Sequence, residues 1–260
     1  MVNVRPAFLS LPERAEKPRR RGITHVLDKG MPAGEVDALL QVCGPYVDVW
    51  KLGWGTAYLD PGIGDKLALL DHHGVLACTG GTLLEVAWQQ GAVDEFLDWA
   101  ASAGFPCVEV SCGVVNMIAT QKRALIETTA ARFIVLGEIG AKDPGVPVSA
   151  REWALAAAAD LEAGATWVVT EGRESGTVGL YDSSGEVRAD VVEAVVDAIG
   201  VDSTVFEAPR KDQQAWLIRR FGADVNIGNV VPGEALGLEA LRLGLRADTL
   251  TTSERRTPTP

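Results

Sequence analysis

Acidic side chains recur near the ends of the apolar, β-branched runs of this sequence, where a strand would give way to a loop. Asp28 ends the first run, and four later runs each carry a glutamate: Glu109, Glu138, Glu171 and Glu207. A carboxylate among Val, Ile, Leu and Phe is costly to bury unless it is paired, hydrogen-bonded or bound to a metal. A hard cation such as Mg²⁺ takes oxygen ligands of this kind. We therefore interpret Glu138 and Glu171 as the first candidates for metal ligands, and the other two glutamates as alternatives.

Basic side chains follow the same runs, at Lys29, Lys51, Lys142 and Arg173. Acids and bases that meet at one site would suit a divalent cation together with an anionic substrate. The alternative interpretation is a ring of salt bridges that neutralises itself and only stabilises the fold. Glycines also lie at these run ends, for example Gly80 and Gly81, and backbone N–H groups in such loops can bind anionic oxygens.

The elements that would position these residues alternate regularly along the chain. Apolar runs predict strands at 22–28, 46–51, 75–78, 107–111, 132–136, from 167, at 204–207 and at 224–228. Helical periodicity predicts helices at 35–43, 66–72, 84–90, 93–103, 120–130, 149–163, 188–199, 213–221 and 234–244. This order predicts a single-domain α/β protein, a (β/α)₈ TIM barrel over residues 21–250, with an irregular arm at 1–20 and a disordered tail at 251–260.

The strand ends of such a barrel converge on one rim, which is where the active sites of this architecture lie. A doubly wound open sheet is the structural alternative. The sequence has no GxGxxG after the first strand and no Walker motif, which disfavours the nucleotide-binding version of that fold.

Composition excludes several classes of function. A formal net charge of −11 argues against nucleic-acid partners and anionic membrane surfaces, although a local cationic pocket remains compatible with it. No apolar run is long enough to span a bilayer, and the N-terminus lacks the pattern of a signal peptide. The four cysteines form no CxxC pair, so we expect reduced thiols, a cytoplasmic protein and no structural zinc. We also expect a homo-oligomer.

Five motifs of this chain resemble those of the phosphosulfolactate synthase family. They are KLGWGT at 51–56, GGTLLE at 80–85, EGRESG at 171–176, FEAP at 206–209 followed by QQ at 213–214, and LRLGLRADT at 241–249. The resemblance extends from about residue 17 to residue 249, with the motifs in order.

The resemblance implies a (β/α)₈ barrel that depends on Mg²⁺ and adds sulfite to phosphoenolpyruvate, giving phosphosulfolactate, an early step towards coenzyme M. In such an enzyme Lys142 matches the lysine that is proposed as the proton donor, with Lys51 and Glu171 as further catalytic residues. The phosphate is expected near the loops after the seventh and eighth strands. The residues expected to bind the anionic substrates are Lys29, Gly80, Gly81, Arg173, Ser175, Gly176, Asn229 and Arg246.

The chain departs from the family pattern at three places. Ala141 stands before Lys142 where the family usually has a second lysine, SCGV at 111–114 replaces a Ser-Asp-Gly-Ser pattern, and Cys78-Thr79 precedes the glycine pair. Two alternatives therefore stay open. One is a lyase or transferase that acts on another phosphorylated or sulfonated three-carbon acid, and the other is a barrel that binds or scaffolds without catalysis.

Overall fold

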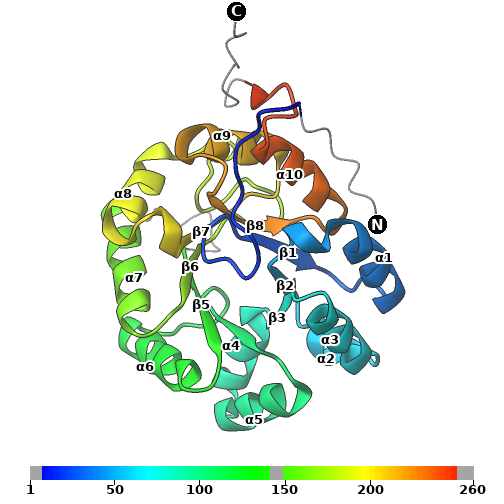
Figure 1. The fold of residues 1–260 in the computed structure, drawn as a ribbon. Helices are drawn as coiled ribbons and strands as arrows, with labels where there is room; N and C mark the ends of the chain where they lie inside the picture. Colours follow the sequence, from blue (N-terminus) through cyan, green and yellow to red (C-terminus); the bar gives the residue numbers. More distant parts are fainter. Residues whose placement is uncertain (1–7, 141–148, 251–260) are drawn as a thin grey trace, which may run out of the picture.

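Eight parallel strands pair in chain order and close into a barrel, as the computed structural model shows for residues 8–140 and 149–250 (Figure 1). The strands are β1 (Thr24–Asp28), β2 (Val49–Leu52), β3 (Leu76–Thr79), β4 (Cys107–Val110), β5 (Ile134–Ile139), β6 (Trp167–Thr170), β7 (Thr204–Glu207) and β8 (Asn226–Val230). The predicted (β/α)₈ barrel is confirmed, and the open sheet is not found.

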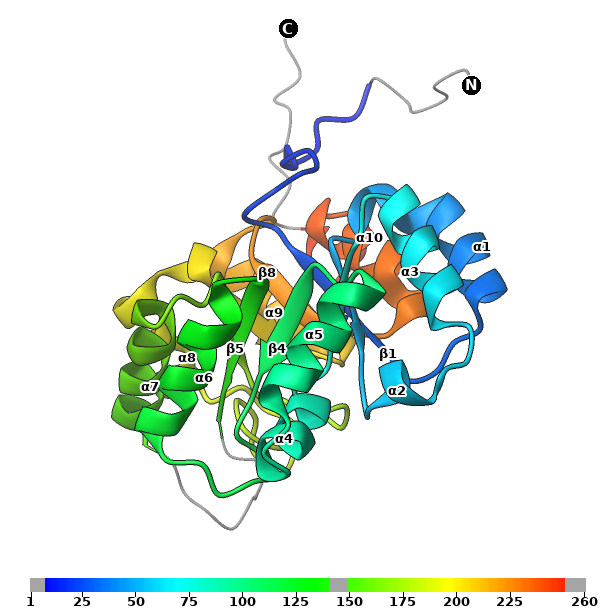
Figure 2. The same ribbon diagram turned by 90° about the horizontal axis from the view of Figure 1, so that it is seen from below.

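Helices surround the barrel and connect its strands (Figures 1 and 2). They are α1 (Ala33–Cys43), α2 (Thr56–Leu59), α3 (Ile63–His72), α4 (Gly81–Gln89), α5 (Val93–Ala103), α6 (Ala119–Ala130), α7 (Ala150–Glu162), α8 (Ala189–Ile199), α9 (Lys211–Phe221) and α10 (Ala235–Arg242). Helix α2 was not predicted, because four residues are too few to show a helical period. Within the described ranges, no helix combines the length and the apolar character that crossing a bilayer requires.

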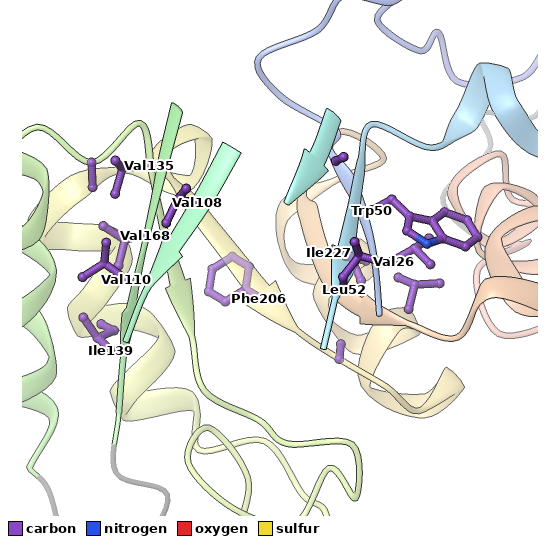
Figure 3. Packing of buried hydrophobic residues seen from close by; sticks show 14 of the residues in the cluster. Val26, Trp50, Leu52, Val108, Val110, Val135, Ile139, Val168, Phe206 and Ile227 are labelled. Atoms are coloured by element: carbon purple, nitrogen blue, oxygen red, sulfur yellow. The ribbon is translucent and has the colours of Figure 1, made fainter. Parts of the chain in front are cut away.

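Alternate residues of each strand face the helices and the barrel interior. Val26, Trp50, Val108, Val168 and Phe206 belong to the larger core, which packs between sheet and helices (Figure 3). A separate apolar cluster contains residues of the opposite parity: Ile23, Val49, Cys78, Cys107, Leu136, Trp167, Val169 and Val205. This second cluster fills the interior of the barrel, and we call it the apolar floor. The inward-facing residues nearer the carboxyl ends of the strands lie directly next to it.

Two strands extend at least two residues further than their sequence patterns predicted, and each contains a glycine that packing requires. β5 continues from its predicted end at residue 136 through Gly137 to Ile139, and a Cβ atom on Gly137 would come within 2.7 Å of the Asp160 carboxylate in α7. β8 continues from its predicted end at Gly228 to Val230, and a Cβ atom on Gly228 would approach the ring of His25 to 2.9 Å. These glycines allow close packing inside strands, although in the sequence they resemble loop residues.

The N-terminal segment from residue 8 to residue 22 crosses the amino-terminal end of the barrel, where the strands begin (Figure 2). It contains no helix or strand in its described part, but it is anchored. Arg14 forms an ion pair with Asp224 and donates through Nε to Glu239 at 3.1 Å. Lys17 Nζ donates to the carbonyl of Val47 at 2.6 Å. The arm therefore belongs to the packed structure at this end.

Arg242 is the central cation at this end, and replacing it by methionine should destabilise the protein strongly. It is fully buried and donates to the carbonyls of Ala223 and Val225, both at 2.6 Å, and of Ile23 at 3.1 Å. Losing these bonds leaves buried acceptors unsatisfied, so we expect the free energy of unfolding to fall by about 3–5 kcal/mol. Urea unfolding would measure this. The control is Arg220→Met, which removes an exposed ion pair with Glu193 and should change stability by less than about 1 kcal/mol; an equal loss in both variants would contradict the anchoring role.

Candidate active site

A cavity of about 250 Å³ opens at the carboxyl ends of the strands, and we call it the central cavity. Among the described residues, five glutamates and two basic side chains line it: Glu109, Glu138, Glu171, Glu174, Glu207, Lys51 and Arg173. The excess of carboxylates over cations favours the binding of a cation. The carboxyl end of the barrel is also the end at which this architecture builds its active sites.

Lys51 lies at the centre of this charged layer. Its Nζ atom is 2.9 Å from Glu109 Oε2 and 3.0 Å from Glu207 Oε1. Burial alone would lower the pKa of Lys51, but the carboxylates of Glu109, Glu207 and then Glu138 outweigh it and raise that pKa well above its usual value. Lys51 therefore stays an ammonium, which supplies a fixed positive charge and does not exchange protons near neutral pH.

Three of the glutamates form a cluster that can hold a metal ion. Glu109, Glu138 and Glu207 are buried, and one oxygen atom from each lies within 4.8 Å of the others. Backbone groups orient two of them: Gly81 N–H donates to Glu109 Oε1 and Gly172 N–H to Glu207 Oε2, both at 2.9 Å. Mg²⁺ takes oxygen ligands and is usually held by one or two carboxylates together with waters or substrate oxygens, so these pre-positioned carboxylates fit such an ion.

Glu171 was one of the two first candidates for a metal ligand, but it lies outside this cluster. β6 ends at Thr170, so Glu171 belongs to the following loop, and its Oε1 accepts a hydrogen bond from the Arg173 N–H at 2.7 Å. The geometry instead groups Glu138 with Glu109 and Glu207. Glu171 lines the cavity beside them and fixes the loop that carries Arg173.

The N-terminus of α4 contributes a region of the cavity that suits anions. Gly80, Gly81 and Thr82 line the cavity where this helix begins, and the N-terminal end of a helix favours negative groups. Both glycines are required by packing. A Cβ atom on Gly80 would lie 2.9 Å from the carbonyl oxygen of Leu52, and one on Gly81 would overlap the side chain of Ser111.

Left-handed backbone conformations also concentrate at the central cavity. Among the described residues, three that are not glycine have positive φ: Trp54 at 55°, Arg173 at 52° and Asn229 at 52°. All three line the central cavity. Such conformations are costly for residues other than glycine and tend to persist at functional sites.

Four residues expected to bind substrate do not line the central cavity: Ser175, Gly176, Arg246 and Lys29. The exposed Ser175 shares a hydrogen bond with Thr177 at 2.8 Å. Gly176 is buried under Gln213, whose Nε2 donates to its carbonyl at 2.8 Å, so it shapes the β6 loop. Arg246 lies past the end of α10 with its guanidinium near Gly237, outside the cavity. Helix α10 runs back towards the opposite end of the barrel, which carries Arg246 away from the mouth.

Lys29 lies at a neighbouring cavity of about 440 Å³, which we call the side cavity. Its ammonium lies over the ring of Trp54, 4.7 Å from the centroid. Leu27, Glu174 and Asn229 line both cavities and so form their shared wall. Lys142, the expected proton donor, falls outside the described residues.

Asp28 was placed at the mouth by sequence; it lines the side cavity but not the central cavity, and its carboxylate faces the helix layer. It accepts from the Gly30 and Met31 N–H groups at 2.7 Å each and from Trp50 Nε1 at 2.9 Å. Leu27, its neighbour, lines the central cavity instead. Asp28 therefore fixes the loop after β1.

Glu85 is a structural carboxylate that the sequence analysis did not single out. Its side chain accepts from the backbone N–H groups of Gly113, Val114 and Val115 at 2.6–3.1 Å and from the Ser111 hydroxyl, which holds the loop after β4. Burial opposes the charge of Glu85, but these hydrogen bonds outweigh it and lower its pKa. The GGTLLE motif could have identified Glu85, because it places this glutamate one helical turn after Gly81.

Comparison with known proteins gives one consistent family. The profile of the (2R)-phospho-3-sulfolactate synthase family matches residues 12–248. The chain is 40% identical over 245 residues to phosphosulfolactate synthase from Methanothermobacter thermautotrophicus, covering 92% of this chain and 95% of that protein. It is 38% identical over 244 residues to phosphosulfolactate synthase from Bacillus subtilis, covering 93% and 97%.

Solved structures share the fold at much lower sequence identity. The crystal structure of 3-keto-L-gulonate-6-phosphate decarboxylase from Vibrio cholerae aligns with a TM-score of 0.54 at 13% identity, covering 89% of this chain and 99% of that one. At this identity the likeness concerns the barrel architecture alone.

Proposed function

Because this chain belongs to the (2R)-phospho-3-sulfolactate synthase family, we propose that it catalyses the addition of sulfite to phosphoenolpyruvate. The observation that carries this proposal is the pairing, in one cavity, of a three-carboxylate cluster with cationic and helix N-terminal groups. The carboxylates suit a divalent cation, and the positive groups suit the three anions of such a reaction: sulfite, phosphate and carboxylate.

The proposed reaction forms one carbon–sulfur bond and adds one proton. The lone pair of the sulfite sulfur attacks the methylene carbon of phosphoenolpyruvate, and the electrons of the double bond move towards the carboxylate. A proton then adds to C2, and the phosphate ester remains intact. Negative charge increases at the substrate carboxylate in the first step, so groups that stabilise charge there lower the barrier.

The residues of the central cavity have distinct roles in this proposal. Glu109, Glu138 and Glu207 would hold Mg²⁺, which when bound stabilises the charge that develops on the substrate carboxylate. Lys51 keeps two of these carboxylates in place and adds a permanent positive charge. Arg173 and the N-terminus of α4 bind the phosphate and sulfite oxygens from the sides of β6 and β3.

The departures from the family pattern support the same proposal where the structure describes them. Neither Cys78 nor Cys112 lines the central cavity. Cys78 belongs to the apolar floor, and Cys112 Sγ donates to the carbonyl of Met117 at 3.2 Å. Neither thiol is therefore exposed to the cavity in which sulfite and the metal would bind.

Removal of divalent metal is the experiment that tests this function. Purified protein incubated with phosphoenolpyruvate, sulfite and Mg²⁺ should produce phosphosulfolactate, detected by mass spectrometry and ³¹P NMR. Treatment with EDTA should abolish product, because the developing charge loses its main stabilising group, and added Mg²⁺ should restore it. The control omits sulfite and should leave phosphoenolpyruvate unchanged. Absence of product at every metal concentration would contradict the proposal, and product formation that survives complete chelation would contradict the metal dependence.

A further inference from the structure

Asn229 occupies an irregularity in the barrel wall that redirects its side chain. Between β1 and β8 the register runs from Thr24 opposite Ile227 to Val26 opposite Val230, so β8 contains one extra residue. Asn229 absorbs it with φ of 52°. Bulges of this kind turn a side chain towards a new direction and occur at barrel rims beside active sites. Asparagine tolerates the left-handed conformation better than other residues with a side chain.

The backbone of this bulge is held from inside the barrel. The Asn229 N–H group donates to Nδ1 of His25 at 3.4 Å, and Gly228 leaves the space that the imidazole occupies. His25 is fully buried, so its ring is fixed in this position by the surrounding barrel interior. The bulge is therefore held in place by a hydrogen bond and by the packing of the His25 ring against Gly228.

The side chain of Asn229 has a polar atom without a partner. The residue is 5% exposed, and its Oδ1 atom is buried with no hydrogen-bond partner among residues 8–140 and 149–250. A buried acceptor that stays unsatisfied is costly, so such an atom indicates a donor or cation that completes it in the working protein. Asn229 lines the central cavity, and Gly228, the residue before it, pairs with Glu207 of the carboxylate cluster.

We propose that Asn229 Oδ1 is an additional oxygen donor to the divalent cation held by Glu109, Glu138 and Glu207, directly or through one water molecule. This inference rests on the proposed function, because it needs the cation that the reaction uses. The substrates of that reaction are anions that present mainly acceptor oxygens, so a cation suits a carbonyl oxygen at this position better than they do. Amide carbonyls are ordinary ligands of hard cations and add to the coordination without adding negative charge.

The test measures Mn²⁺ binding to the substrate-free protein by electron paramagnetic resonance and calorimetry. Mn²⁺ prefers the same carboxylate and carbonyl ligands as Mg²⁺ and gives a direct signal. Asn229→Gly removes the amide and keeps the left-handed backbone free of strain, so the metal-free protein should unfold at the wild-type temperature or above it. We expect its Mn²⁺ dissociation constant to rise about 10- to 100-fold. Asn229→Asp should bind Mn²⁺ at least as tightly as the wild type, because it keeps an oxygen at that place.

Glu138→Gln provides the matched control in the same titration. It separates a failure of the inference about Asn229 from a failure of the proposed metal site. If Glu138→Gln loses Mn²⁺ affinity and Asn229→Gly does not, Asn229 is no donor to the cation and the proposed function stands. If Glu138→Gln also binds as the wild type does, the carboxylate cluster is not the metal site, and both the inference about Asn229 and the metal site of the proposed function are overturned. A raised KM for phosphoenolpyruvate in Asn229→Asp with weakened Mn²⁺ binding would also overturn the inference, since it would place an anion at this amide.

Discussion

Replacing Lys51 by methionine should abolish turnover and lower the free energy of unfolding of the metal-free protein by about 3–5 kcal/mol. Lys51 donates to Glu109 and Glu207 inside the barrel, and its side chain is only 6% exposed. Methionine preserves the length and apolar stem of the side chain but removes the ammonium. Two buried carboxylates then lose their cation, and the third member of the cluster, Glu138, lies close to both. The cost is therefore electrostatic.

A divalent cation should restore part of the free energy of unfolding that Lys51→Met loses. This recovery distinguishes a role of Lys51 at the metal site from a general loss of stability. A cation that binds only the folded protein stabilises it according to its concentration and affinity, and in Lys51→Met it also replaces the missing charge. Chemical denaturation with and without Mg²⁺ would show the effect. Lys66→Met is the control, since Lys66 is equally buried and pairs with Asp28 and Asp60 outside the carboxylate cluster. It should be destabilised without gaining from Mg²⁺. Equal gains in both variants, or a Lys51→Met protein as stable as the wild type, would contradict the assignment.

The difference in the free energy of unfolding between the wild type and Lys51→Met should change with pH in a defined direction. The pKa of Lys51 in the folded protein is raised well above its value in the unfolded chain, which is about 10.4. A raised pKa means that the folded state holds the proton more tightly, so the contribution of Lys51 is complete below about pH 10.4. It is lost as the pH rises through the folded pKa. The stability difference between wild type and Lys51→Met should therefore be constant from pH 7 to pH 9 and shrink at higher pH.

The fold could be predicted from this sequence because the alternation of apolar runs and helical periods is visible without tertiary information. The residues at which strands end were harder to predict where a glycine lies inside a strand. Gly137 and Gly228 make room for the Asp160 carboxylate and the His25 ring, and such neighbours are known only from the packed structure. The same extension of β8 placed Asn229 within the strand and at the bulge.

The site was only partly predictable, because strands of a parallel barrel are buried on both faces. An amphipathic strand shows by its alternation which residues face the core, but a strand that is apolar on both sides does not. Asp28 and Glu109 both stand near strand ends in sequence, yet the first faces the helices and the second the barrel interior. Parity within the strand, which is a property of the closed barrel, decides between Asp28 and Glu109. Glu171 has the same inward parity as Glu109, but it follows the end of β6 and lies outside the carboxylate cluster.

The proton donor can be narrowed by elimination among the residues that line the central cavity. Lys51 is held as an ammonium by its carboxylates, and a guanidinium such as that of Arg173 does not release its proton. None of the three histidines lines the cavity. Among the described residues that line the cavity, this leaves the carboxylic acids and the hydroxyl of Thr82. The family resemblance indicates Lys142, which falls outside the described residues.

Replacing Lys142 by alanine should therefore lower kcat by about 10²- to 10⁴-fold, the usual contribution of a positioned acid. The KM for phosphoenolpyruvate should change much less, because Arg173 and the N-terminus of α4 would still bind the anionic groups. Steady-state kinetics with Mg²⁺ would measure both constants, and unchanged Mn²⁺ binding would show that the carboxylate cluster is intact. Lys211→Ala removes an exposed lysine that pairs with Asp248 and should leave kcat at the wild-type level. If Lys142→Ala keeps near-normal kcat, protonation falls to a carboxylic acid of the cavity, and Glu171, buried beside the cluster and outside it, becomes the residue to replace next.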